Sequence, residues 1–434
     1  MPALVYRITE VLSAVVIDLP IGTNLGLFHI LWTLLSGRLL QSRGALIPAL
    51  AATGLEPAAV RRAWAAVAYG AWDVAALIAA LQALVRQEGR WHARHVGGYR
   101  VVAVDTVAFF RPRLKDCATK HFLSQAGEAL PAIPFGLIAS VGQVGTQTVP
   151  VVRQVVRAPS PTATETEVVQ AVLTQAATRL APDEAVVVDR GFGVGRLLAA
   201  GVPRWVSRVP RNFTARRVSL PEYCGKGRPP SRGALVRPLA RTRKGQTLAA
   251  TQPDRTETIL VAGRSVQVQI WNDLCLPQAA ACAASFQCVV VRDPAYTQPW
   301  VLTTNLALAA ADLLAFYHER WPVEQVPLTA KQLIGAQRQF VFAETTRQRL
   351  PELALLASSL LMYLAATHPA QATGFWDRTP RPTAGRFRRV LAQLDISKTA
   401  PLPGQLRKKE SVTDHLPKGI QSHRRSALPI EPRV

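Results

Sequence analysis

The chain has 434 residues, which exceeds one ordinary compact domain and predicts about two or three units with cores of their own. Its 51 Lys and Arg against 28 Asp and Glu leave a formal charge of +23, so nucleic acid is the first partner to consider and a merely basic soluble protein is the alternative. Five cysteines without a C-x-x-C pair indicate neither a disulfide framework nor a zinc site, and they favour reduced thiols in the cytoplasm.

The first predicted elements are helices. Between residues 24 and 90, Ala and Leu recur at three- and four-residue spacing, with Gly at the breaks. This stretch predicts two helices joined by a tight turn at Thr53–Gly54, and the second helix carries Arg61 and Arg62. The pattern fits a helix-turn-helix whose second helix enters the DNA major groove, and an ordinary helical hairpin gives the same pattern. Residues 1–95 are therefore predicted to be a helical N-terminal domain and a candidate for DNA binding.

Strands and helices alternate in the next part of the chain. Apolar, β-branched runs predict three strands, the first of which is YRVVAVD, ending at Asp105. A helix over about residues 165–180 follows, with Thr164 or Thr166 as its N-cap. The run EAVVVDRG then predicts a strand that ends at Asp189, before a helix near residues 194–200 and the strand RWVSRV.

The order of these elements is that of an RNase H-like fold. In that fold the first and fourth strands lie side by side and parallel, so Asp105 and Asp189 are expected to become neighbours although they lie far apart in the sequence. The predicted fold class is α/β, with an RNase H-like catalytic core over residues 96–208 and 285–370.

A basic segment interrupts this core. Residues 209–284 contain Pro, Gly and many cations, followed by the hairpin ETILVAGRSVQVQIW, and are predicted to be a β-rich insertion. The core resumes with SFQCVVVRD, PWVLTTNL and a long helical region over about residues 309–366, while residues 371–434 are basic, Pro-rich and predicted to be partly disordered. The cations of the insertion are candidates to line a DNA path, with solvated surface charge as the alternative. They are Arg211, Arg216, Arg217, Lys226, Arg228, Arg232, Arg241, Arg243 and Lys244.

The most specific pattern follows the last predicted strand. At about 100° per residue, four side chains fall on one narrow face of a helix: Tyr317, Arg320, Glu324 and Lys331. A carboxylate flanked by cations and a phenol suits a site that holds a metal ion and grips phosphates at once. Pro327 removes one helical hydrogen bond within this stretch and is expected to kink the face.

This spacing, tyrosine, two residues, arginine, three residues, glutamate, six residues, lysine, resembles the signature of a large group of bacterial insertion-sequence transposases of the DDE type. The resemblance extends to VVAVDT, VVVDRGF, the strand W-x-L-x-T-N-L and KQLIGAQ, and it spans about residues 95–365. It implies that the chain is a DNA transposase, which cleaves the ends of a mobile element and transfers the 3′-hydroxyl strands into target DNA.

The resemblance also implies the catalytic residues. Asp105, Asp189 and Glu324 match the acidic triad, whose chemistry needs carboxylates that converge on two Mg²⁺ ions roughly 4 Å apart. Oxygen ligands without thiols or imidazoles favour magnesium, with Mn²⁺ able to substitute. For either aspartate alone, a cap at the end of a strand is the alternative.

The remaining implied contacts are to DNA. Tyr317, Arg320 and Lys331 resemble phosphate and terminal-nucleotide contacts, and Arg190 beside the second aspartate is a weaker candidate. The indole of Trp300 or Trp321 is a candidate to stack on a flipped base, and core packing is the alternative for each.

The implied partners are double-stranded DNA, as terminal inverted repeats and as target, and a second copy of the chain in a synaptic dimer. A bacterial cytoplasmic, nucleoid-associated protein is expected, because the N-terminus lacks a secretory pattern and the apolar run Leu350 to Thr367 contains Glu352 and favours a buried core helix over a membrane span. Two alternatives stay open: an RNase H-like DNA endonuclease that cuts without joining, and a catalytically idle DNA-binding descendant of a transposase.

Overall fold

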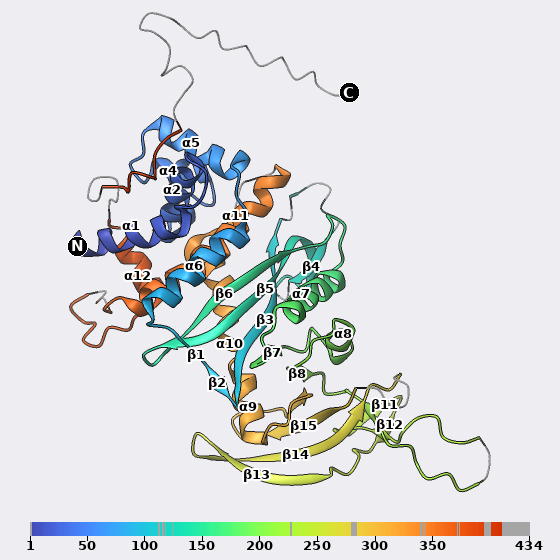
Figure 1. Cartoon of the computed structure of the whole chain (residues 1–434). Coiled ribbons are helices and arrows are strands. Elements are labelled where there is room, and N and C mark those ends of the chain that lie inside the picture. The colour runs from blue at the N-terminus through green and yellow to red at the C-terminus, as the bar shows by residue number, and fades with distance from the viewer. Residues whose placement is uncertain are drawn as a thin grey trace, which may run out of the picture.

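The computed structural model describes residues 2–409 except 112, 115–116, 118, 124, 226–227, 279–283, 339–340, 342, 371, 373 and 395–400. Lys226 of the basic segment and the predicted C-terminal tail beyond residue 409 lie outside the described residues. The described part combines a helical bundle, built mainly from the start of the chain, with a long mixed sheet (Figure 1).

Six helices begin the chain: α1 (Pro2–Val16), α2 (Thr23–Leu35), α3 (Arg38–Gln41), α4 (Leu46–Ala51), α5 (Pro57–Tyr69) and α6 (Val74–Glu88). A short turn joins α4 to α5, so the two-helix unit predicted from the Ala and Leu spacing is confirmed as local structure. Asp73 caps α6, because its carboxylate accepts a hydrogen bond of 2.8 Å from the N–H of Ala76.

Helix α11 (Glu344–Thr367) connects this bundle to the sheet, since it contacts α2, α5, α6 and strand β6 (Figure 1). By length and composition α11 could cross a membrane, and so could the bent pair of α5 and α6 if it is counted as one span. However, 94% of the most apolar window of α11 is buried inside the protein. This burial confirms the predicted core helix and fits a soluble protein.

One mixed sheet runs through the rest of the described chain, with the strand order β1, β5, β3, β7, β8, β16, β15, β14, β9, β10. Strands β4 and β6 also pair with β5, β2 pairs with β3, and β13 pairs with β14. The bounds are β1 (His92–Ala93), β2 (His95–Val96), β3 (Tyr99–Phe110), β4 (Lys120–Leu123), β5 (Glu128–Val144), β6 (Gln147–Arg157), β7 (Glu184–Val188), β8 (Trp205–Val209), β9 (Ala215–Arg217), β10 (Leu235–Val236), β13 (Arg255–Val261), β14 (Arg264–Cys275), β15 (Phe286–Arg292) and β16 (Trp300–Thr304). The α/β class predicted from the sequence is confirmed.

Helices cover both faces of this sheet around β3. Helices α7 (Glu165–Arg179) and α8 (Val194–Ala199) belong to one face, while α6, α10 (Trp321–Thr329) and α11 belong to the other. Residues of β3 alternate between the two cores, with Val102 and Val104 toward α7 and Val101 and Ala103 toward α11. Thr164 caps α7 in a reciprocal capping box with Glu167, which decides between the two caps that the sequence allowed.

Most strands of the basic segment belong to the main sheet. Its strands β9, β10, β13 and β14 extend the main sheet beyond β15, and β11 (Arg241–Arg243) and β12 (Gln246–Leu248) form a separate two-stranded sheet. In Figure 1 this extension curves away from the helical bundle. The strands next to the candidate site and the strands of the basic segment are therefore hydrogen-bonded into one continuous layer.

Candidate active site

Two aspartates meet on neighbouring parallel strands. Strand β3 pairs with β7 in the register Arg100↔Glu184 to Ala103↔Val187, and continuing this register two residues further places Asp105 beside Asp189. Asp105 lies within β3, and Asp189 directly follows the last residue of β7. Both belong to the alternate set that faces α10, so their carboxylates leave the sheet on the same side.

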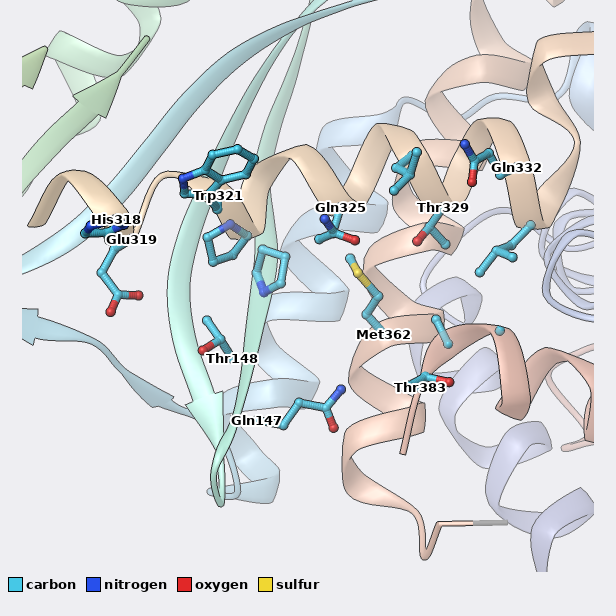
Figure 2. Close-up of a pocket in the computed structure, with 16 residues that line it drawn as sticks. Gln147, Thr148, His318, Glu319, Trp321, Gln325, Thr329, Gln332, Met362 and Thr383 are labelled. Atoms are coloured by element: carbon cyan, nitrogen blue, oxygen red, sulfur yellow. The ribbon is translucent and has the colours of Figure 1, made fainter. Parts of the chain in front are cut away.

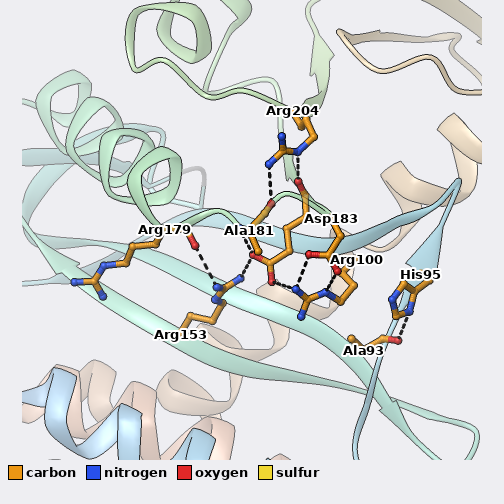
Figure 3. Close-up of polar contacts among 9 residues, drawn as sticks. Ala93, His95, Arg100, Arg153, Arg179, Ala181, Asp183 and Arg204 are labelled. Atoms are coloured by element: carbon orange, nitrogen blue, oxygen red, sulfur yellow. Dashed lines mark hydrogen bonds and ion pairs between the residues drawn. The ribbon is translucent and has the colours of Figure 1, made fainter.

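A network of arginines fixes the opposite ends of these two strands (Figure 3). Arg100 donates two hydrogen bonds of 2.7 and 2.8 Å to Asp183 and lies 3.3 Å from the buried carboxylate of Glu184. Arg153 lies 2.9 Å from the same carboxylate, and Arg204 donates to the backbone carbonyls of Ala181 and Glu184. Because Arg100 and Glu184 are also a register pair, this network holds the alignment that brings the aspartates together.

The single helix face predicted for Tyr317, Arg320, Glu324 and Lys331 is wrong in one respect, because the helix is not continuous. Helix α9 (Ala310–His318) ends at His318, Glu319 has ψ near 0°, and α10 begins at Trp321 with Pro322 in its first turn. The break lies before the predicted kink at Pro327, which α10 accommodates within its length. Arg94 secures the break by donating two hydrogen bonds of 2.7 and 2.9 Å to Glu319.

Tyr317 occupies the last turn of α9, and its side chain is buried. Its hydroxyl donates a hydrogen bond of 3.2 Å to Oδ1 of Asp189. Burial raises the pKa of Tyr317, and the negative charge of Asp189 acts in the same direction. The sequence predicts that Tyr317 contacts DNA. In the structure its side chain is 1% exposed and is bonded to Asp189.

Arg320 is the central cation of the site. It is only 5% exposed, donates a hydrogen bond to Oε1 of Glu324, and lies over the rings of Tyr317 and Trp321 at 5.7 and 5.3 Å. Its Nε is buried and has no hydrogen-bond partner among the described residues. The charge of the guanidinium also opposes the rise that burial causes in the pKa of Asp105, so it acts on the sheet as well as on α10.

Lys331 reaches the same side of the sheet from a π-helical turn, Ala330–Ile334, which follows α10. Its amine lies 5.7 Å from the ring centroid of Phe109 and 5.9 Å from that of Phe110. Burial lowers the pKa of the amine, and the Asp105 carboxylate opposes this effect. Three of the four side chains expected on one helix face therefore influence Asp105 by their charge, and they come from α10 with its N-cap and from the π turn, while Tyr317 of α9 is bonded to Asp189.

The carboxylates influence one another. Burial raises the pKa of Asp105 from 3.8 to about 6, and the charges of Glu324 and Asp189 add to the increase. A hydrogen bond of 2.8 Å from the N–H of Thr106 and the charge of Arg320 act against it. A group of like charges at one place in a partly buried site is a common feature of catalytic and metal-binding centres.

The donor set suits a hard divalent cation, because it consists of carboxylate oxygens from β3, the end of β7 and α10. Within the described ranges, no three His, Cys, Asp or Glu side chains lie close enough together to hold a metal ion, and Glu324 is bonded to Arg320. The oxygen donors are therefore of the type that Mg²⁺ prefers, but in this structure the three acids are not close enough together to share one ion.

The two tryptophans differ sharply in exposure. Trp300 is 7% exposed and packs between Tyr296 and Tyr317, so it has no free face for a base and matches the core-packing alternative. Trp321 is 51% exposed, and the guanidinium of Arg320 lies 5.3 Å from the centroid of its ring. Of the two base-stacking candidates, Trp321 is the one with an exposed side chain.

Arg208 on β8 is a site residue that the sequence argument missed. Its guanidinium lies 5.2 Å from the ring centroid of Trp300, and its proximity opposes the rise that burial causes in the pKa of Tyr317. The strand RWVSRV carries a signal for it, since Arg208 shares the alternate set of Val206, which faces the α10 side. Arg190, by contrast, is exposed in the turn after Asp189.

The predicted DNA-path cations of the insertion fall into two groups. Arg217 pairs with Asp254, while Arg216 and Arg241 donate to backbone carbonyls, so these three stabilise the segment itself. The others that the structure describes are exposed: Arg211, Arg228, Arg232, Arg243 and Lys244. Arg61 and Arg62 are likewise exposed, on α5.

A cavity of about 560 Å³ lies along α10 (Figure 2). Gln325 and Thr329 of α10 line it together with Gln147 and Thr148 of strand β6. Glu324 is not among its lining residues, and neither Lys nor Arg lines it within the described part of the chain. Trp321 does line the cavity, so the cavity borders the site at this residue, whereas Arg320, Glu324 and Lys331 are not among its lining residues.

The chain was compared with protein-family models and with curated protein sequences, and it matches none of either kind.

Proposed function

We propose that this protein is a DDE-type DNA transposase, in which Asp105, Asp189 and Glu324 hold Mg²⁺ or Mn²⁺ and direct phosphoryl transfer at the ends of a mobile element. Two aspartates on adjacent parallel strands lie beside each other, and α10 with its N-cap and the following π turn brings Glu324, Arg320 and Lys331 to the same side of the sheet; this observation carries the proposal. A structural cap at a strand end would not account for two neighbouring aspartates that also lie within the electrostatic influence of Glu324, Arg320 and Lys331.

The topology supports an RNase H-like core as part of this proposal. The strands β6, β5 and β3 are antiparallel to one another, and β7 and β8 continue from β3 in parallel. The order β6-β5-β3-β7-β8 with α7 between β6 and β7 is the arrangement expected for that fold, and it places the first acid on the central strand.

The residues divide the chemistry among them. When bound, magnesium supplies activation of the attacking oxygen and stabilisation of the leaving oxygen. Arg320 and Lys331 balance the negative charge of the scissile phosphate, and Tyr317 holds Asp189 in position through its hydroxyl. Attack by water frees a 3′-hydroxyl at the element's end, and attack by that hydroxyl on a target phosphate joins the two DNAs.

The proposal includes partners and place. Terminal inverted repeats and target DNA are the substrates, two copies of the chain pair two ends in a synaptic complex, and the protein acts at the bacterial nucleoid. The charge of +23 supports a polyanionic substrate. Trp321, whose side chain is about half exposed, is the residue proposed to stack on an unpaired base near the cleaved end.

A cleavage and joining assay tests the proposal. The substrate is linear DNA that carries the inverted repeats flanking the coding region, incubated with a supercoiled target and Mg²⁺. The proposal expects cut and joined products for the wild-type protein, and loss of both in Asp105→Asn, Asp189→Asn and Glu324→Gln with DNA binding retained. Asp312→Asn on α9 is the matched control, since Asp312 carries a carboxylate outside the cluster.

The products also separate the alternatives. Cleavage without joined products would assign an endonuclease, and binding without cleavage by the wild-type protein would assign an idle DNA-binding descendant. Full cleavage by any one of the three acid variants would reject the site itself.

A further inference from the structure

The segment 401–409 near the end of the described chain packs on the N-terminal helical bundle (Figure 1). Leu406 is 4% exposed and belongs to the main hydrophobic core. The backbone on either side of it is bonded to the start of α2, because Asn24 donates a hydrogen bond of 3.0 Å to the carbonyl of Gln405 and the N–H of Gly22 donates one of 3.2 Å to that of Arg407. A buried anchor and two backbone bonds hold the segment at a defined place.

This packing gathers cations from opposite ends of the chain. Arg407, Lys408 and Lys409 follow the anchor directly, and all three are exposed. Lys408 lines one hollow together with Arg62 of α5 and His29 of α2. We call the exposed cations Arg61, Arg62, Arg407, Lys408 and Lys409 the composite basic surface. In the part of the chain that the structure describes, no ion pair joins any of them to a carboxylate.

Half of the residues that line the hollow within this surface are small. Gly22, Gly26, Ala59 and Ala63 form its walls, so a rigid backbone can approach closely. Burial and the charge of Arg62 lower the pKa of His29 to about 4, which leaves this ring neutral at physiological pH and free to accept or donate a hydrogen bond. Adsorption to lipid also uses large apolar side chains beside the cations, and Ile21, next to Gly22, is 44% exposed, so a membrane surface is the alternative that the test distinguishes.

We propose that the composite basic surface binds the phosphate backbone of double-stranded DNA, and that segment 401–409 completes it by docking Leu406 on the bundle. The identity of the polyanion rests on the proposed function, whereas the surface itself rests on the contacts of Leu406, Gln405 and Lys408. The second helix of the predicted helix-turn-helix thus meets DNA together with the C-terminal segment rather than alone.

The test measures the salt dependence of DNA binding with the full chain. Fluorescence anisotropy of a labelled duplex of arbitrary sequence gives the slope of log K against log salt between about 50 and 200 mM. In Lys408→Ala/Lys409→Ala we expect the magnitude of the slope to fall by about 2, because each lost phosphate contact contributes about 0.9. The matched control is Arg86→Ala/Arg90→Ala, which removes the same charge from exposed positions at the end of α6 and beyond, and is expected to leave the slope unchanged.

A second variant separates docking from charge. Leu406→Ser keeps every cation but removes the buried anchor. We expect the magnitude of its salt slope to fall by at least half as much as in the double variant, while the melting temperature of the bundle is unchanged. An unchanged slope in Lys408→Ala/Lys409→Ala, with wild-type binding intact, overturns the inference and leaves the proposed function standing. Failure of the wild-type protein to bind any duplex overturns both, and preferential binding to vesicles of anionic lipid overturns the inference in favour of a membrane.

Discussion

The hydroxyl of Tyr317 donates a hydrogen bond to Oδ1 of Asp189 across 3.2 Å, and this contact joins the end of α9 to the end of β7. The tyrosine is buried against Trp300, so its position is fixed by packing as well as by the bond. Tyr317 is bonded to one of the proposed metal ligands, so its role would be to orient the Asp189 carboxylate and not to contact DNA directly.

Replacing Tyr317 with Phe therefore affects the reaction more than binding. Loss of one hydrogen bond to a carboxylate corresponds to about 1–2 kcal/mol, so we expect the cleavage rate at saturating DNA to fall by about 10-fold. The DNA affinity should stay within about 2-fold of wild type. Tyr296→Phe is the control, because Tyr296 packs on the other side of Trp300 and is 43% exposed. A large loss of DNA affinity with an unchanged cleavage rate would contradict this role and would indicate that Tyr317 contacts DNA.

The raised pKa of Asp105 predicts a pH-dependent stability. Its folded-state pKa of about 6 exceeds the usual 3.8, so the folded protein holds this proton more tightly and loses stability as pH rises from about 4 to 6. Asp105→Asn removes that loss, and we expect it to be more stable than wild type by about 2–3 kcal/mol at pH 8 and equally stable below about pH 4. Urea unfolding at the two pH values measures the difference, and an Asn variant that is no more stable at pH 8 contradicts the assignment.

The register network makes a second stability prediction. Glu184 is buried and shared by Arg100 and Arg153, whereas Asp183 is more than half exposed. Glu184→Ala leaves two arginines without a buried partner and should cost about 3 kcal/mol or more. Asp183→Asn, the control, should cost less than about 1 kcal/mol. Chemical denaturation compares them, and similar losses would mean that the buried carboxylate does not hold the strands.

The position of the π turn depends on Gly335. Its φ of +95° is unfavourable for other residues, and a Cβ added there would lie 2.6 Å from the Cα of Leu40. We expect Gly335→Ala to destabilise the protein by about 2 kcal/mol or more. Gly385→Ala is the matched control, because that glycine lies inside α12 (Ala384–Leu391), has no close neighbour, and should gain about 0.5–1 kcal/mol. Equal thermal shifts in the two variants would contradict the close approach to Leu40.

Part of the fold could be predicted because local patterns coincide with the final structure. The apolar runs before Asp105 and Asp189 have the length and composition of buried strands, and both form strands. Thr164 and the residues after it carry a complete capping signal. Such features depend on neighbouring residues, so a single sequence contains them.

The arrangement around α10 could not be predicted in the same way. The helical face from Tyr317 to Lys331 assumed a constant rotation per residue, but the chain breaks at Glu319 and widens into a π turn at Ala330. Both departures depend on distant partners, namely Arg94 at the break and Leu40 beside Gly335. The burial of Tyr317 and the approach of Arg208 likewise follow from packing between segments far apart in the chain.

The pairing of β3 with β7 has a consequence for how the chain can vary in length. An insertion of one residue between Arg100 and Asp105 would turn the aspartate toward α7. An insertion of two residues would keep its face but shift it along the sheet by about 6–7 Å relative to Asp189. The turns in the connection between β3 and β7 are under no such restriction, so natural differences in length should accumulate there. The number of residues between the arginine network and the aspartates should stay constant.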